Sequence, residues 1–210
     1  MIRSAEKRFA AVARAGAGTL VPRAKDSGAP PVAYEDLLAL ARRRRSVRRF
    51  DGTGVARHVL DRAVDVAAQS PSACNRQAFE FRIFDDPAWV SELVSIAPGY
   101  EPGDAPPPCM VVLVGKYRAY YRERDQHVIY IDASLAAMAF LLALESQGLA
   151  SCCINWPSIR ALDLRMSELL GLDPDEEVIM LMAVGHPAQD AVSPYSQKAP
   201  RDELRSYNPR

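Results

Sequence analysis

The chain has 210 residues, of which 49% are hydrophobic, so it can bury the core of one ordinary domain and is not globally disordered. Its 26 basic and 26 acidic side chains cancel, and a net charge of zero excludes a general attraction to nucleic acid or to an anionic membrane. Any anion-binding site must therefore be local.

The cysteines predict neither a metal centre nor an oxidising compartment. Cys74, Cys109, Cys152 and Cys153 show no C-x-x-C pair and no Cys/His ligand spacing, so no metal site is expected. Cys152 and Cys153 are adjacent in an apolar stretch, and we expect both to be buried free thiols. Free thiols are typical of a reducing compartment, which favours a cytoplasmic protein.

No membrane span is expected either. The longest charge-free helical stretch covers residues 133–144, whereas a spanning helix needs about 20 apolar residues. The N-terminus is basic, but its apolar run FAAVA is shorter than a signal-peptide core of roughly 7–15 residues. An Arg- and Ala-rich organellar presequence stays open as an alternative.

The first 33 residues differ in composition from the rest. Residues 4–14 predict a short helix, and residues 15–33 are rich in glycine and proline, as in a linker or a surface arm. The compact domain is expected to begin near Tyr34. The sequence thus predicts an arm and linker at 1–33 and one domain at 34–210.

Helical and strand patterns alternate irregularly along the domain. Residues 34–45 and 56–70 predict helices, and Pro71 ends the second. Residues 79–84 alternate as in a half-buried strand, 87–96 predict a short helix, and the continuous apolar run at 109–115 predicts a central strand. The expected inward positions of the first two helices are Leu37, Leu38 and Ala41, then Leu60, Val64 and Ala67.

The second half centres on a helix at 128–148 that is apolar nearly all round and is therefore expected to be buried. Residues 151–154 predict a strand, 158–171 a helix with Ser158 as its N-cap, and 177–185 another buried strand. These are too few strands for a doubly wound sheet. The sequence predicts an α+β fold in which a small sheet packs on a long helix.

The most unusual stretch is RRRRSVRRF at 42–50, with six arginines around Ser46. The helix dipole favours cations at a helix end by about 0.3–1 kcal/mol each, which accounts for two or three arginines but not six. A nucleic-acid patch would bring interleaved aromatic residues, and only Phe50 is present. Guanidinium and hydroxyl groups suit phosphate. Composition alone leaves open phosphate binding and a solvated helix end.

Three further stretches each allow two interpretations. SPSACNRQ at 70–77 offers amide donors and acceptors for a planar heterocycle, or is a turn that caps its own backbone. GLASCCINWP at 148–157 presents backbone N–H groups to a ligand, or is a core strand. Lys198 is a second phosphate ligand or a surface lysine. No P-loop, nucleophile elbow or catalytic triad is recognisable.

In this order, the four stretches resemble the nitroreductase family of FMN-dependent oxidoreductases, over residues 34–208. The resemblance implies a small, mostly antiparallel sheet flanked by helices. The sequence departs from the family at Ala78 and Phe79, where the family often has Pro-Trp. Its region between the second motif and the long helix is also shorter than in the family. The matching residues are Arg44, Arg45, Ser46 and Arg48; Pro71, Ser72, Asn75 and Gln77; Gly148, Leu149 and Ser151; Gly185 and Pro187; and Lys198.

The resemblance also implies roles toward FMN. Arg44, Ser46 and Lys198 would hold the phosphate, with Arg45 alongside. Arg48 would approach the N1/C2 carbonyl edge of the ring, where a cation stabilises the reduced flavin. Asn75, from the segment that also holds Pro71, Ser72 and Gln77, would bond the ring or ribityl chain. The backbone near Asn155 and Trp156 would face N5 and O4.

The implied activity passes hydride from NADH or NADPH through flavin N5 to a small nitro, quinone or enone acceptor by a ping-pong mechanism. The family builds its two FMN sites at a homodimer interface, so a homodimer is expected. Two alternatives stay open: a flavin-dependent dehydrogenase of a biosynthetic intermediate, and a non-catalytic dimeric module that has lost FMN. No side chain is expected to act as acid or base, because the flavin supplies the chemistry.

Overall fold

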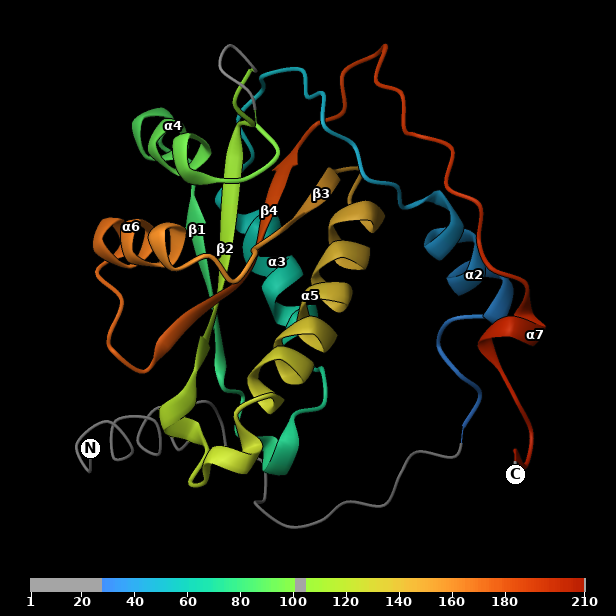
Figure 1. Ribbon diagram of the computed structural model, residues 1–210. Coiled ribbons are helices and arrows are strands. Elements are labelled where there is room, and N and C mark those ends of the chain that lie inside the picture. Colours follow the sequence, from blue (N-terminus) through green and yellow to red (C-terminus); the bar gives the residue numbers. More distant parts are fainter. Residues whose placement is uncertain (1–27, 101–104, 210) are drawn as a thin grey trace, which may run out of the picture. The chain divides into compact units, whose positions relative to one another are not determined.

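The computed structural model describes residues 28–100 and 105–209 (Figure 1). Contacts divide the chain into two units, Met1–Ala33 and Tyr34–Arg210, and the second unit holds every element described below. The helix predicted at 4–14 lies outside the described residues.

The second unit is built on a four-stranded sheet in the order β1-β2-β4-β3, and each neighbouring pair is antiparallel. The strands are β1 (Phe79–Phe84), β2 (Cys109–Lys116), β3 (Ala150–Asn155) and β4 (Glu176–Gly185). The central strands β2 and β4 carry the two continuous apolar runs, since both of their faces are covered. The predicted α+β class is confirmed.

Helices cover both faces of this sheet (Figure 1). Along β2 the side chains alternate between two cores. Val111 and Leu113 pack with α3 (Arg57–Ala67) and with Phe140 of α5 (Val128–Ser146). Met110 and Val112 pack with α4 (Pro87–Ile96) and α6 (Arg160–Leu170).

Two helix starts show how local chemistry sets the boundaries. Asp86 caps α4 by accepting the backbone N–H groups of Ala88 and Trp89, with Pro87 at the first helical position. The prediction of Ser158 as the cap of α6 is wrong. The helix begins at Arg160, after an extended Ile159 that provides no side-chain cap. A turn in which Ile159 N–H donates to the Pro157 carbonyl delays the start.

The expectation that α5 is buried is met on one side of the helix only. One face packs on the sheet, but Ile131, Leu135 and Met138 are 51%, 45% and 43% exposed. These residues are spaced along one side of the helix, so they form a continuous apolar stripe. By length and composition the stretch Glu123–Ser146 could cross a membrane, yet half of it is buried, as in a core helix.

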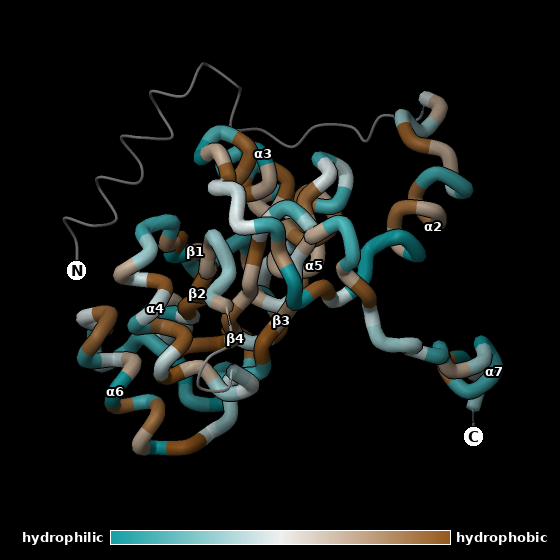
Figure 2. The backbone as a smooth tube through the Cα atoms, turned by 90° about the horizontal axis from the view of Figure 1, so that it is seen from above, coloured by the Kyte–Doolittle hydropathy of each residue, from teal (hydrophilic) through white to brown (hydrophobic). Residues whose placement is uncertain are grey.

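The first helix, α2 (Tyr34–Arg43), has no buried residue, so the inward face predicted for it is not covered by its own chain. Leu37, expected to face inward, is 51% exposed. Figure 2 shows hydrophobic segments both in the sheet and on α2, which stands apart from the sheet layers. Both α2 and α5 therefore present apolar surface to the outside of the unit.

A cluster of ion pairs lies where β2 ends and β4 begins. The Glu176 side chain is only 3% exposed and lies 2.7 Å from Arg82 Nη2 and 3.6 Å from Lys116 Nζ, with Arg118 as a third cation. Burial by itself raises the pKa of Glu176. The N–H of Asp173 and the three cations outweigh it, so the pKa lies below its usual value of 4.5.

This cluster predicts acid sensitivity. Because the native pKa of Glu176 is depressed, its contribution to stability is present above about pH 4.5 and is lost as pH falls through the native value. We expect Glu176→Gln to lower the free energy of unfolding at pH 7 by about 1.5–3 kcal/mol, as for a charged hydrogen bond. Urea titrations should show the difference from wild type shrinking towards pH 3. A constant difference would contradict this.

Candidate functional site

The arginine segment leaves α2 and runs along the edge of the sheet. Val47 N–H donates to the Ser151 carbonyl at 3.0 Å, and Ser46 bridges to Ser151 in parallel register. Further on, Phe50 bridges to Pro187 in antiparallel register. The residue at 185 must be small here, because a Cβ on Gly185 would lie 2.8 Å from the Phe50 ring and 2.5 Å from Pro108. The glycine thus lets the segment cross the end of β4.

The C-terminal tail follows the same segment. Asp51 N–H donates to the His186 carbonyl, and Ala188 N–H donates to the Arg49 carbonyl, at 3.0 and 3.1 Å. Farther along, Arg45 Nη2 donates to the Pro194 carbonyl at 2.8 Å. Lys198 lies four residues beyond Pro194 and is exposed. The first part of the tail therefore contacts the arginine segment, and Lys198 lies shortly after the last of these contacts in the sequence.

The arginines of this segment differ in their partners: some bond to other parts of the chain and others do not. Arg43 pairs with Glu145 and Arg49 with Asp190, each at 2.8 Å, so these two are exposed but not merely solvated. Arg45 is occupied by the tail. Within the described part of the chain, Arg42, Arg44 and Arg48 form no ion pair. Arg42 lies in the exposed last turn of α2, so Arg44 and Arg48 are the two unpaired guanidinium groups on the segment that follows the helix.

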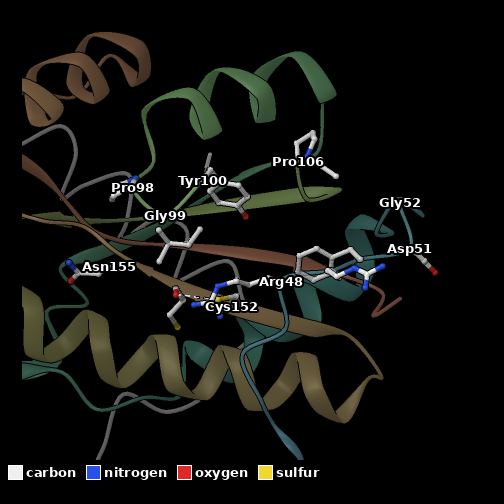
Figure 3. Close-up of a pocket in the computed structure, with 14 residues that line it drawn as sticks. Arg48, Asp51, Gly52, Pro98, Gly99, Tyr100, Pro106, Cys152 and Asn155 are labelled. Carbon is white, nitrogen blue, oxygen red and sulfur yellow. Dashed lines mark hydrogen bonds between the residues drawn. The ribbon is translucent and has the colours of Figure 1, made fainter. Parts of the chain in front are cut away.

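A cavity of about 990 Å³ opens beside this segment (Figure 3). Figure 3 shows Arg48 and Cys152 on one wall, Asn155 at one end, and the connection between α4 and β2 on the opposite wall. Tyr100 of that connection points its hydroxyl into the cavity. The remaining lining residues are Arg49, Phe50, Asp51, Gly52, Pro98, Gly99, Ala105, Pro106, Cys153 and Ile154.

The two cysteines of this wall differ. Cys152 is buried, as predicted, but Cys153 is exposed, so that half of the prediction is wrong. Adjacent side chains of a strand point to opposite faces, so Cys152 and Cys153 cannot both face the same core. Burial raises the pKa of the Cys152 thiol, while the charges of Arg48 and Arg44 lower it. The thiol thus lies within the field of both available arginines.

Asn155 and Trp156 end the same edge strand. Asn155 is exposed and lines the cavity. Trp156 turns away, because its indole Nε1–H donates to Asp163 Oδ1 at 2.7 Å and its ring packs in the core under α4 and α6. The Trp156 side chain is therefore not available to a ligand in the cavity, and the role predicted for its backbone stays a prediction.

The second polar stretch forms a tight turn after α3. Ser72 Oγ accepts the Gln77 N–H at 3.0 Å, and Gln77 Nε2 donates to Asn75 Oδ1 at 3.1 Å. Cys74, Asn75 and Gln77 have φ values of 54°, 55° and 50°, which side chains other than glycine rarely adopt. Pro71 precedes the turn and is exposed.

Within one chain the structure does not bring this turn to the arginine segment. Arg43 contacts Glu145 near the end of α5, whereas Ala73 N–H donates to Asp132 near its start. These two α5 residues are 13 positions apart, or about 20 Å along the helix axis. Figure 1 shows the two ends of α5 at opposite ends of the sheet.

Sequence reasoning missed Tyr100 and Asp132. Tyr100 lies in a proline-rich connection without periodicity, and nothing in the sequence singles it out. Asp132 had a signal, because it is the one acidic residue in the apolar run 128–144. Across residues 28–100 and 105–209, no group of three or more His, Cys, Asp or Glu side chains could hold a metal ion.

The sheet, its two helix layers and a cavity lined by arginines define the α+β architecture of the unit. The chain belongs to the nitroreductase family, whose model matches residues 41–97 and 88–186, and it is an oxidoreductase.

Among curated proteins, human iodotyrosine deiodinase 1 is 23% identical over 198 residues, covering 81% of this chain and 68% of the relative. Iodotyrosine deiodinase of Nematostella vectensis is 24% identical over 191 residues, covering 78% and 71%.

Solved structures share the fold. An FMN-dependent nitroreductase from Clostridium difficile superposes with a TM-score of 0.69 at 20% identity, covering 82% of this chain and 99% of that one. A putative NAD(P)H:FMN oxidoreductase from Staphylococcus epidermidis has a TM-score of 0.71 at 17% identity, covering 90% and 99%.

The cysteine environments predict an order of alkylation by iodoacetamide. Cys74 and Cys153 are both exposed, but Cys74 should react first, because partial desolvation by the surrounding groups raises the pKa of the Cys153 thiol and lowers its thiolate fraction. Cys109, whose pKa burial raises to about 12, and the buried Cys152 should react only after unfolding. Peptide mass spectrometry over time measures this, with urea-unfolded protein as the control. Labelling of native Cys109 as fast as Cys74 would contradict it.

Proposed function

We propose that the protein is an FMN-dependent oxidoreductase that acts as a homodimer and uses NADH or NADPH to reduce a small nitro, quinone or enone compound by a ping-pong mechanism. Family membership supports the general reaction. The four free cysteines favour a reducing compartment, the cytoplasm.

FMN carries a phosphate dianion on a polar chain and a flat ring edged with carbonyl groups. Arg48 and Asn155 line the cavity, whereas Arg44 and Ser46 lie on the segment that leads to it and Lys198 lies on the tail. Arg44, Ser46 and Lys198 would hold the phosphate, and the lack of a carboxylate partner for Arg44 among residues 28–100 and 105–209 supports this role. Charge-assisted bonds from guanidinium to phosphate are among the strongest hydrogen bonds in proteins. Asn155 and the Trp156 backbone would edge the ring.

FMN, when bound, would take hydride from the reduced nicotinamide and give it to the acceptor. The chain would supply orientation and charge. Arg48, on the cavity wall opposite Tyr100, would place a cation at the pyrimidine edge and so favour negative charge there (Figure 3). The connection that carries Tyr100 would shield that edge from water.

The observation that carries the dimer is the separation of the two polar stretches along α5. An FMN that touches both the arginine segment and Asn75 cannot take both from one chain, because they lie at opposite ends of that helix. A two-fold axis across α5 would place the arginine segment of one copy beside the turn of the other. The exposed stripe of Ile131, Leu135 and Met138 supplies apolar surface for such packing.

Reductive dehalogenation of a halogenated aromatic compound is a second candidate, because the curated relatives are iodotyrosine deiodinases. It needs two electrons and one proton for each halide released, so the same cavity would serve. Halide release from iodotyrosine, compared with the oxidation of NAD(P)H by nitro and quinone acceptors, discriminates between the two.

FMN binding tests the proposal directly. Purified protein should be yellow and should release FMN, not FAD, on denaturation. Arg44→Ala removes charge-assisted hydrogen bonds worth about 1.5–3 kcal/mol each, so FMN affinity should fall about tenfold or more. Arg42→Ala removes the same charge from the exposed end of α2 and should change affinity little. Wild-type protein that takes up no added FMN would falsify the proposal.

Subunit complementation tests the shared site. Arg44→Ala and Asn75→Ala chains with different tags are co-expressed, and the mixed dimers are isolated. If each site takes the two residues from different copies, one site of the mixed dimer carries both changes and the other carries neither. About half of the sites should then bind FMN with wild-type affinity. If both residues come from one chain, the mixed dimer should have no intact site.

A further inference from the structure

The turn at 72–77 keeps its shape through contacts that come from outside it. Three of its residues, Cys74, Asn75 and Gln77, occupy the left-handed region, which the chain would leave if nothing held it there. Its internal hydrogen bonds, from Gln77 N–H to Ser72 Oγ and from Asn75 N–H to the Ser72 carbonyl, close the turn but do not fix it to the rest of the unit.

The external contact is Asp132, a charged residue that is only 2% exposed. Both of its carboxylate oxygens lie 3.1 Å from Ala73 N, and the Tyr120 hydroxyl donates to Oδ2. A buried carboxylate is stable only where such donors replace its lost water. Asp132 thus ties the turn to the first half of α5.

Tyr120 joins a third segment to this anchor. It lies in the connection from β2 to α5, and the Arg76 guanidinium sits 5.2 Å from the centre of its ring, so the turn contacts the tyrosine as well as the carboxylate. Burial and the hydrogen bond to Asp132 raise the pKa of the Tyr120 hydroxyl, which therefore stays protonated and able to donate.

We propose that Asp132 and Tyr120 are positioning residues for the flavin site, holding the strained turn so that Asn75 meets a flavin held by the arginine segment of the second copy. The inference rests on the proposed function and deepens it. Neither residue touches the cofactor. They act through the turn, whose outer residues Cys74, Asn75 and Gln77 are exposed in the single chain.

Three variants and one control test the anchor. Asp132→Ala removes the acceptor of Ala73 N–H, Asp132→Asn keeps one oxygen for it, and Tyr120→Phe removes a single hydroxyl. Glu177→Gln is the matched control, because Glu177 accepts the hydroxyls of Tyr117 and Tyr130 without contacting the turn. FMN affinity is measured by fluorescence titration. The visible absorption and circular dichroism of bound FMN report how firmly the ring is held.

We expect Asp132→Ala to lower FMN affinity about tenfold and to change the visible spectrum of bound FMN, with smaller effects for Asp132→Asn and Tyr120→Phe. Glu177→Gln should match wild type in both. Should Asp132→Ala fail to fold, the other two variants decide.

Unchanged affinity and spectrum in folded, dimeric variants would overturn the anchor while leaving the proposed function intact. Equal losses in the Glu177→Gln control would also overturn it, since the role would then be general stability. Wild-type protein that binds no FMN would overturn the proposed function and the anchor together.

Discussion

The structure depends on a helix that is apolar nearly all round and is covered by its own chain on only one side. α5 packs against the sheet through residues such as Phe140 and Leu144, which are fully buried. The same helix presents Ile131, Leu135 and Met138 to the outside. Exposed apolar stripes of this kind mark interaction surfaces in soluble proteins. The helix that forms the core is thus also the helix along which a second copy can complete the site.

This arrangement explains why the polar stretches lie so far apart in one chain. The turn at 72–77 is fixed to the start of α5 and the arginine segment to the far end of β3 and β4. Each is anchored by the sheet and by α5, so neither can move to the other. The same contacts that hold each stretch in place therefore keep the two apart, and the proposed two-fold dimer would bring the arginine segment of one copy to the turn of the other.

Much of the fold could be predicted from the sequence. The buried strands at 109–116 and 176–185 are continuous apolar runs, and the Asp86–Pro87 start of α4 is a standard capping signal. The apolar composition of α5 favoured it as an interface element. Which of its sides is left uncovered could not be predicted, because a helix that is apolar nearly all round has the same sequence pattern whether its own chain or another copy covers it.

The candidate site could likewise be predicted only in part. The arginine cluster allowed either a phosphate site or a solvated helix end, and six identical side chains say nothing of which ones pair with Glu145 or Asp190, since those partners are more than 90 residues away. The exposure of Cys153 was missed because edge strands and central strands share the same apolar composition here. Such distinctions depend on strand order, which no local pattern contains.

The composition of the turn is the last feature that needs a physical account. A left-handed residue other than glycine costs roughly 1–2 kcal/mol, and the turn has three. Glycine would remove that cost, and Asn75 alone is a residue that tolerates this region well. The hydrogen bonds to the buried Asp132 carboxylate, at about 1.5–3 kcal/mol each, offset a strain of this size. Side chains at positions that glycine would occupy with less strain indicate that those side chains have a role. The side chains of Asn75 and Gln77 form a hydrogen bond with each other at the exposed surface of the turn. The strain is thus consistent with a surface shaped to meet a ligand, held in place from the core side by α5.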